Sequence, residues 1–291
     1  MSSILFKDSF KKFTVKKISG TLKEKMMFER KNRILLKELV KTDFKLRYQG
    51  SIMGYVWSVL KPLMLFTVMY VVFVRFLKFG QDVPHFEVAL LLGTVLWSFF
   101  SETTNLGMSS IVTRGDLLRK LSFPTHIIVI AVSINALINL VISLVIVLLF
   151  AMINGADISI YAFLAPLLLI ELYAFSLGVS FILATIYVRF RDIGPIWEVV
   201  LQAGFYLTPL IYPLTLVMNM DVNIAKLLMM NPMAQIIQDM RHILTSTSNI
   251  TVWQLINTNW IVAIPYVLPW IVLVAGYMIF NKNSKKFAEI I

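Results

Sequence analysis

The chain has 291 residues, of which 58% are hydrophobic, and its mean hydropathy is +0.78. A soluble domain of this length does not need so large an apolar fraction, so the composition predicts an integral membrane protein instead. The formal charge of +11 does not indicate nucleic-acid binding, because the basic residues cluster outside the apolar runs, where they predict orientation and contact with anionic lipid. The absence of cysteine excludes disulfides and thiolate metal sites.

Residues 1–50 are predicted to be a basic segment outside the membrane, and residues 51–291 a single transmembrane domain. An apolar stripe predicts an amphipathic interface helix over residues 32–48; its members are Leu35, Leu36, Leu39, Val40 and Phe44. Lys37, Lys41 and Lys45 stand four residues apart on another face. Such a row costs roughly a few tenths of a kcal/mol per pair, so it favours an anionic membrane surface opposite, with a solvated lysine face as the alternative.

Six apolar blocks follow, at residues 52–76, 86–108, 127–153, 158–188, 195–212 and 260–280. Each covers, or nearly covers, the ~20 residues that a helix needs to cross a bilayer. The second block gives the weakest signal, because its purely apolar part is short and Glu102 lies in its continuation. The fifth is short and contains Gly204 and Pro209, which can break a helix. The predicted fold class is all-α integral membrane, with about six transmembrane helices.

The segment between the last two blocks, residues 213–259, is not polar enough for a simple loop. It predicts two short amphipathic helices, at residues 224–230 and 233–244, which are separated by Asn231 and Pro232. These helices would either re-enter the membrane or cap its surface.

The basic residues are distributed unevenly over the two sides of this arrangement. With an even number of spans both termini share one side, and that side holds all but four of the 27 Lys and Arg residues; the exceptions are Arg75, Lys78, Lys226 and Arg241. Because basic loops stay in the cytoplasm, both termini are predicted to be cytoplasmic.

A motif marks the boundary between the basic segment and the first span. It runs Arg47-Tyr48-Gln49-Gly50-Ser51-x-Met53-Gly54-x-x-Trp57-x-x-x-x-Pro62. It resembles the start of the membrane subunit of bacterial ABC exporters for O-antigen, teichoic acid, rhamnose polymers and related polysaccharides, and a weaker similarity continues along the chain. The resemblance implies a permease of the cytoplasmic membrane that moves lipid-linked polysaccharide. It also implies two copies of this chain with two separate ATPase subunits, which carry the ATP and Mg²⁺, and no cofactor on this chain.

The same resemblance assigns two cytoplasmic links to the ATPase contact. The first is predicted to be a short amphipathic helix that stops before Pro124, where the family has a coupling helix; its residues are Arg114, Leu117, Leu118, Leu121 and Phe123. The second link lies between the fourth and fifth blocks and contains Arg189, Arg191 and Asp192. The alternative for the first link is an ordinary basic loop.

Two sets of residues are candidates for contact with the substrate. Lys45, Arg47 and Lys61 would lie at the cytoplasmic mouth and bind the pyrophosphate of a lipid carrier, although topology and lipid headgroups also explain basic residues there. The second set would line a conduit for sugars, which bind aromatic faces; it consists of Tyr55, Tyr70, Phe205 and Tyr206. Aromatic residues at the membrane interface are the alternative for this set.

Polar residues inside the apolar blocks provide the remaining candidates. Glu171 lies near the middle of the fourth block, where an ionisable group is costly, so it is either a functional site or a structural hydrogen-bonding carboxyl. Asn135 and Asn139 lie four apart in the third block and predict hydrogen bonds between helices. A membrane enzyme that uses Glu171 or Glu102 as acid or base is a rival function, as is a permease for drugs or small lipids.

Three kinds of site are missing from the sequence. The ATP-binding motif G-x-x-x-x-G-K-[ST] does not occur, so ATP hydrolysis is expected on another subunit. The three histidines show no metal-ligand spacing, and the hydrolase motif G-x-S-x-G does not occur. We therefore expect neither a metal site nor a catalytic site.

Overall fold

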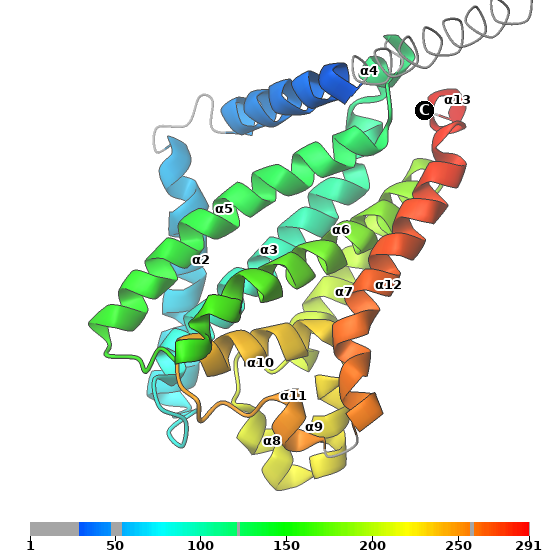
Figure 1. Cartoon of the computed structure of the whole chain (residues 1–291). Coiled ribbons are helices and arrows are strands. Elements are labelled where there is room, and N and C mark those ends of the chain that lie inside the picture. The colour runs from blue at the N-terminus through cyan, green and yellow to red at the C-terminus, as the bar shows by residue number, and fades with distance from the viewer. Residues whose placement is uncertain (1–28, 48–53, 121–122, 257–258, 291) are drawn as a thin grey trace, which may run out of the picture.

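The computed structural model describes residues 29–47, 54–120, 123–256 and 259–290, and these residues are mostly helical (Figure 1). Residues 29–47 form a helix that we call the basic helix. The other elements are η1 (Gly54–Val56), α2 (Trp57–Met69), η2 (Tyr70–Phe76), α3 (Phe86–Thr113), α4 (Gly115–Lys120), α5 (His126–Ile153), η3 (Ile160–Leu164), α6 (Ala165–Arg189), α7 (Ile193–Leu207), α8 (Leu214–Met220), α9 (Val222–Met229), α10 (Pro232–Leu244), α11 (Val252–Leu255), α12 (Asn259–Ser284) and α13 (Phe287–Ile290).

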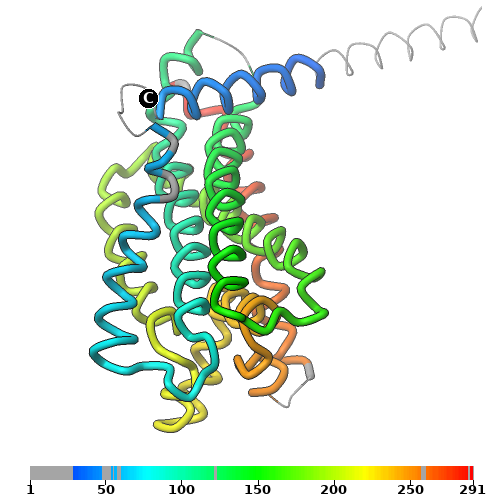
Figure 2. The backbone as a smooth tube through the Cα atoms, turned by 90° about the vertical axis from the view of Figure 1, so that its left-hand side faces the viewer, coloured from blue at the N-terminus to red at the C-terminus, as the bar shows by residue number. Residues whose placement is uncertain are grey.

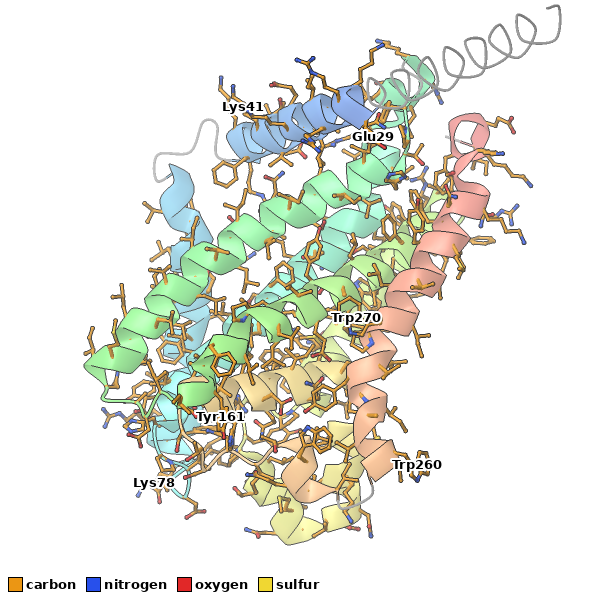
Figure 3. All side chains as sticks on the ribbon, in the orientation of Figure 1. Glu29, Lys41, Lys78, Tyr161, Trp260 and Trp270 are labelled. Carbon is orange, nitrogen blue, oxygen red and sulfur yellow. The ribbon has the colours of Figure 1, made fainter. Side chains whose placement is uncertain are left out.

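The long helices run side by side between two ends of the molecule (Figures 1 and 2). The basic helix lies across one end, where α4 and α13 also lie, and we call this the basic end. The short helices α8, α9 and α11 lie at the opposite end, which we call the far end, and α10 crosses the bundle above them. Figure 3 shows Lys41 at the basic end, and Lys78 and Trp260 at the far end. The long helices therefore cross in alternating directions, as the six predicted blocks require.

Four helices are long and apolar enough to cross a membrane: Phe86–Thr113, His126–Ile153, Ile160–Arg189 and Trp260–Ser284. The first predicted block corresponds to α2, which continues without a break into the π-helix η2. The fifth corresponds to α7, which has 15 residues and is therefore only ~22 Å long, short of the ~30 Å of hydrocarbon. The all-α membrane fold is confirmed, and the predicted fifth block is wrong in its end, because the helix stops at Leu207, before Pro209.

Helix α3 is the centre of the bundle, although its sequence gives the weakest span signal. It packs against α2, α5, α6, α7 and α10. Its polar residues lower its hydropathy, but Thr94, Thr104 and Ser110 are buried and donate hydroxyl hydrogen bonds to carbonyls three or four residues earlier. A helix of this kind needs no apolar surface for lipid, because other helices cover it.

Helices α6 and α12 form the closest crossing in the described bundle. A Cβ added to Gly276 would lie 2.3 Å from the carbonyl oxygen of Gly178, and one added to Gly178 would lie 2.6 Å from the Cα of Leu273. The two glycines therefore bring the backbones of these helices together, as small residues do in membrane bundles.

The two short helices predicted before the last span are confirmed. Helix α9 ends at Met229, Asn231 caps α10 by accepting a hydrogen bond of 3.0 Å from the Met233 amide, and Pro232 is the first residue of α10. Proline is favoured at this position because its missing N–H would have no partner there. In addition, α8 and α11 join these helices in an apolar cluster with the start of α12.

Candidate functional site

Two ion pairs attach the basic helix to the bundle. Arg47 pairs with Glu102 of α3, and the same Glu102 oxygen accepts a hydrogen bond of 3.0 Å from Asn139 of α5. One turn earlier on the basic helix, Asp43 pairs with Arg114, the residue that follows α3. The four charged side chains keep 16–28% of their exposure, so they are partly shielded from water. These contacts form a charged junction at the basic end.

The predicted substrate gate is only partly assembled in this junction. Arg47 lies in it, whereas Lys45 and Lys61 have exposed side chains, on the basic helix and on α2. Residues 48–53, which hold most of the boundary motif, lie outside the described part of the chain. Binding of a carrier pyrophosphate by these cations stays a prediction. On binding the pyrophosphate, Arg47 would either keep its ion pair with Glu102 or exchange it for the phosphate.

We expect that reversing the charge of Arg47 loosens the basic helix. Arg47→Glu places two carboxylates in contact and should cost about 1–3 kcal/mol, because a charged hydrogen-bonding partner is lost. The thermal unfolding of the purified protein measures this loss. The double variant Arg47→Glu with Glu102→Arg restores opposite charges and should recover the stability. If export stays lost in the stable double variant, Arg47 has a role in substrate binding as well; if Arg47→Glu unfolds like the unmodified protein, the junction is not structural.

The first predicted coupling link forms α4, between α3 and α5. Leu118 and Phe123 pack against an apolar cluster of the chain itself, so they are turned inward, and Leu117 is half-buried. Leu121 lies outside the described residues. The exposed side chains of α4 are Asp116, Arg119 and Lys120. A partner protein that binds α4 would therefore contact these charged side chains first and the leucines only after them.

The second predicted link, between α6 and α7, lies at the basic end too. Arg189, Arg191 and Asp192 are all exposed. The guanidinium of Arg191 lies 5.3 Å from the ring centre of Tyr187, a cation–π contact that orients it. Contact of this link with an ATPase stays a prediction.

The predicted channel aromatics lie in different surroundings. Tyr70 and Phe205 pack against the main core, where Phe205 contacts Trp97 with ring centres 6.0 Å apart. Tyr206 is 55% exposed at the end of α7. The side chain of Tyr55 lies outside the described residues. Of the described members, Tyr206 is the exposed one. A conduit lined by this set stays a prediction.

A second predicted set, the polar residues inside the membrane, gives a mixed outcome. Asn139 links α5 to α3 through Glu102, as predicted for a hydrogen bond between helices. Asn135 is buried, and neither of its side-chain polar atoms has a hydrogen-bond partner among the described residues, so a bond from Asn135 to another helix stays a prediction. Glu171 is buried where α6 meets α10 and α12.

Arg241 of α10 is a buried cation that the sequence does not single out. It is 1% exposed and donates to four oxygens: those of Ala89 at 3.0 Å, Pro209 at 2.6 Å, Leu210 at 2.7 Å and the Gln238 side chain at 3.0 Å. The carbonyls of Pro209 and Leu210 follow the end of α7, where backbone acceptors lack helical partners. Arg241 therefore binds the non-helical end of α7 and the start of α3 to α10.

Asp239 lies on the same helix and takes part in a separate polar cluster. Its Oδ2 accepts hydrogen bonds from Gln235 at 2.9 Å and from the Tyr266 hydroxyl of α12 at 2.6 Å. Burial raises the pKa of the Asp239 carboxyl, and these hydrogen bonds and the nearby His242 act against that rise. The signal for Asp239 and Arg241 in the sequence is two opposite charges that stand two residues apart in the amphipathic helix predicted at residues 233–244.

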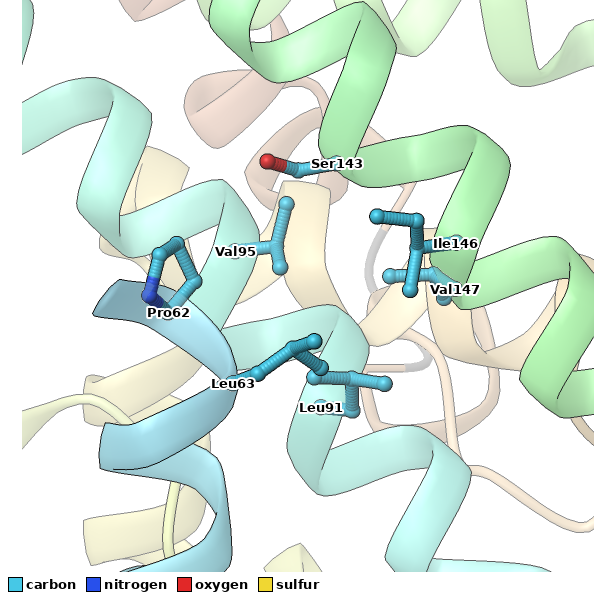
Figure 4. Close-up of a pocket in the computed structure, with 7 residues that line it drawn as sticks. All are labelled: Pro62, Leu63, Leu91, Val95, Ser143, Ile146 and Val147. Atoms are coloured by element: carbon cyan, nitrogen blue, oxygen red, sulfur yellow. The ribbon is translucent and has the colours of Figure 1, made fainter. Parts of the chain in front are cut away.

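The cavity found between α2, α3 and α5 is too small for a sugar. A cavity of about 10 Å³ lies between α2, α3 and α5, lined by Pro62, Leu63, Leu91, Val95, Ser143, Ile146 and Val147 (Figure 4). This is room for about one water molecule. A larger hollow of about 320 Å³ lies at the basic end between α6, α12 and α13 and is lined in part by Arg189 and Lys286. Neither hollow runs from one end of the bundle to the other, since the first lies between α2, α3 and α5 and the second lies at the basic end.

Comparison with known proteins gives the family. The model of the ABC-2 type transporter family matches residues 34–245, which include every long helix except α12. The chain belongs to this family. Among curated relatives, the O-antigen export system permease protein RfbA of Myxococcus xanthus is 30% identical over 88% of this chain and 95% of its own length. Two proteins of the same name from Klebsiella pneumoniae are 26% and 24% identical over the same shares.

Membership of the ABC-2 family decides between the classes of function that the sequence leaves open. The chain is a multi-pass membrane protein and a transport subunit, so the membrane-enzyme hypothesis, with Glu171 or Glu102 as acid or base, is set aside. Glu102 pairs with Arg47 and Asn139 at the basic end, whereas Glu171 of α6 is buried where that helix meets α10 and α12.

Proposed function

We propose that this chain is the membrane subunit of an ATP-driven exporter that moves a lipid-linked cell-surface polysaccharide, such as O-antigen or teichoic acid, across the bacterial cytoplasmic membrane. The observation that carries the proposal is the similarity to permeases named for O-antigen export, which extends over nearly their whole length. The boundary motif from Arg47 to Pro62 supports the same assignment.

The working unit would contain two copies of this chain and two ATPase subunits. The path for the polymer would lie between the two copies. Both termini, α4 and the link between α6 and α7 would face the cytoplasm, in agreement with the uneven distribution of Lys and Arg. Closure of the ATPase pair on ATP and Mg²⁺ would push on α4 and shift the helices as rigid bodies.

Substrate-stimulated ATP hydrolysis tests the proposal. We expect the complex with its ATPase, in lipid nanodiscs, to hydrolyse ATP faster when a lipid-pyrophosphate-linked oligosaccharide is added. The matched control is the same oligosaccharide without the lipid, which should not stimulate. Stimulation by drugs or small lipids but not by the linked oligosaccharide would favour the rival permease function.

Coupling to the ATPase should depend on the exposed charges of α4. Arg119→Glu together with Lys120→Glu leaves the inward leucines untouched, so we expect normal folding and a loss of ~10-fold or more in co-purified ATPase, since several rim charges change sign. Lys78→Glu makes a similar change at the far end and should retain the ATPase. Full retention in the α4 double variant would refute the assignment of α4 as a coupling helix.

A further inference from the structure

The polar cluster at the far end has no part in the proposed export path. It joins three helices through Glu171 of α6, Gln235 and Asp239 of α10, and Tyr266 of α12. Glu171 is 6% exposed and Gln235 is fully buried. Gln235 and the charge of Asp239 lie near enough to the Glu171 carboxyl to act on it. The carboxyl groups of Glu171 and Asp239 are therefore close to each other in one buried cluster.

The hydrogen bonds in this cluster are unevenly distributed. Gln235 and Tyr266 both donate to the same Asp239 oxygen, Oδ2. Three buried oxygens have no hydrogen-bond partner within the described chain: Glu171 Oε1, Gln235 Oε1 and Asp239 Oδ1. The amide oxygen of Gln235 is an independent sign of a missing donor, because it belongs to an uncharged and fully buried side chain. An ionised carboxylate accepts hydrogen bonds but cannot donate them. If both acids were ionised, these three oxygens would have no hydrogen-bond donor between the two acids.

We propose that this cluster is a proton-binding site, in which Glu171 carries a proton and donates it to Gln235 Oε1, and Asp239 carries the single negative charge. The protonated Glu171 carboxyl then gives the Gln235 oxygen a hydrogen-bond donor. The Gln235 amide accepts from one acid and donates to the other, so it connects them. A single buried charge with two donors on it costs far less than two adjacent ones.

The other ionisable groups around the pair fit a single negative charge. On α10, His242 acts on Asp239, and on α12 the Tyr266 hydroxyl donates to it. Arg241 donates to oxygens of Ala89, Pro209, Leu210 and Gln238 and gives no hydrogen bond to either acid. Among the described residues, no group of three or more His, Cys, Asp or Glu side chains could hold a metal ion here.

The bound proton stabilises the packing of α10 against α6 and α12. When it leaves, two buried charges repel each other and the Gln235 oxygen loses its donor. The unfolded chain releases this proton above the ordinary pKa of a glutamate, ~4.3, whereas the folded chain keeps it to higher pH. Stability should therefore fall as the pH rises from the acidic range and level off once the folded chain has also lost the proton.

Infrared spectroscopy of the purified full chain in detergent tests the site directly. We expect the carbonyl band of a protonated carboxylic acid at pH 7, its loss on titration to pH 9, and its absence from Glu171→Gln. The matched control is Glu289→Gln, an exposed acid on α13, which should keep the band. Absence of a titrating band from the unmodified protein would overturn the proposal, and this readout needs no variant to fold.

Thermal unfolding gives a second readout. The unfolding midpoint of the unmodified chain should fall by ~4 °C or more between pH 5 and pH 7, whereas Glu171→Gln, which keeps a donor toward Gln235, should show a flatter profile. Repeating the series with sodium in place of potassium distinguishes a proton from a bound cation. A midpoint that depends on sodium and not on pH would contradict the proposal.

Discussion

Replacing Arg241 with methionine should prevent the far end of the protein from folding stably. The side chain is buried and gives hydrogen bonds to four oxygens on α3, on α10 and after α7. Each buried acceptor that loses its only partner costs ~1–3 kcal/mol. The sum is a large part of the ~5–15 kcal/mol that separates folded from unfolded proteins. Methionine keeps the length of the side chain, so the expected loss comes from the hydrogen bonds and not from a cavity.

The measurement is the yield of monodisperse protein in detergent and its unfolding temperature. Arg241→Lys should recover part of the loss at most, because one ammonium cannot reach the acceptors that the planar guanidinium contacts. Lys226→Met removes a half-buried cation from neighbouring α9 and should be close to neutral. An Arg241→Met protein as stable as the unmodified chain would show that these oxygens find other donors.

The crossing of α6 and α12 should be the second most sensitive place. Gly276→Leu would force a side chain into the Gly178 carbonyl oxygen, which lies 2.3 Å from the position of an added Cβ. The obstacle is backbone, so no rotamer change relieves the clash and the helices must separate. Overpacking typically costs about 1–3 kcal/mol, and we expect the upper end of this range even for Gly276→Ala.

Comparison with another glycine isolates the effect of the crossing. A Cβ at Gly194 of α7 would meet Tyr187 at 3.4 Å, an ordinary contact, so Gly194→Ala should leave the unfolding temperature unchanged. Both substitutions replace a buried helical glycine by alanine and favour the helix equally. If Gly276→Ala unfolds at the same temperature as Gly194→Ala, the close crossing is not needed for folding.

The sequence predicts the fold where apolar length carries the information. The helices α5, α6 and α12 match their predicted blocks closely, because each faces lipid or other helices with a nearly continuous apolar surface. The prediction is weakest for α3, whose buried threonines and serines depend on neighbours that hydropathy does not include. It misjudges α7 because Pro209 ends the helix early and Arg241, distant in sequence, binds the released backbone.

The candidate sites are less predictable for the same reason. The charge pattern identifies Arg47, but only the fold brings Glu102 to it from 55 residues away. Leu117 and Leu118 suggest an apolar docking face, yet Leu118 belongs to the interior of the chain. Glu171 stands out as a charge in an apolar block, whereas Gln235 and Tyr266, its neighbours in the cluster, carry no signal of their own.

The charged junction at the basic end has a consequence for how the protein responds to ionic strength. Mobile ions screen charges that water reaches, and at physiological salt this screening acts over ~8 Å. The pairs Arg47–Glu102 and Asp43–Arg114 keep some exposure, whereas Arg241 is almost completely enclosed. Concentrated salt therefore loosens the basic helix while α10 stays packed, so the two ends of the same bundle differ in their dependence on the electrolyte.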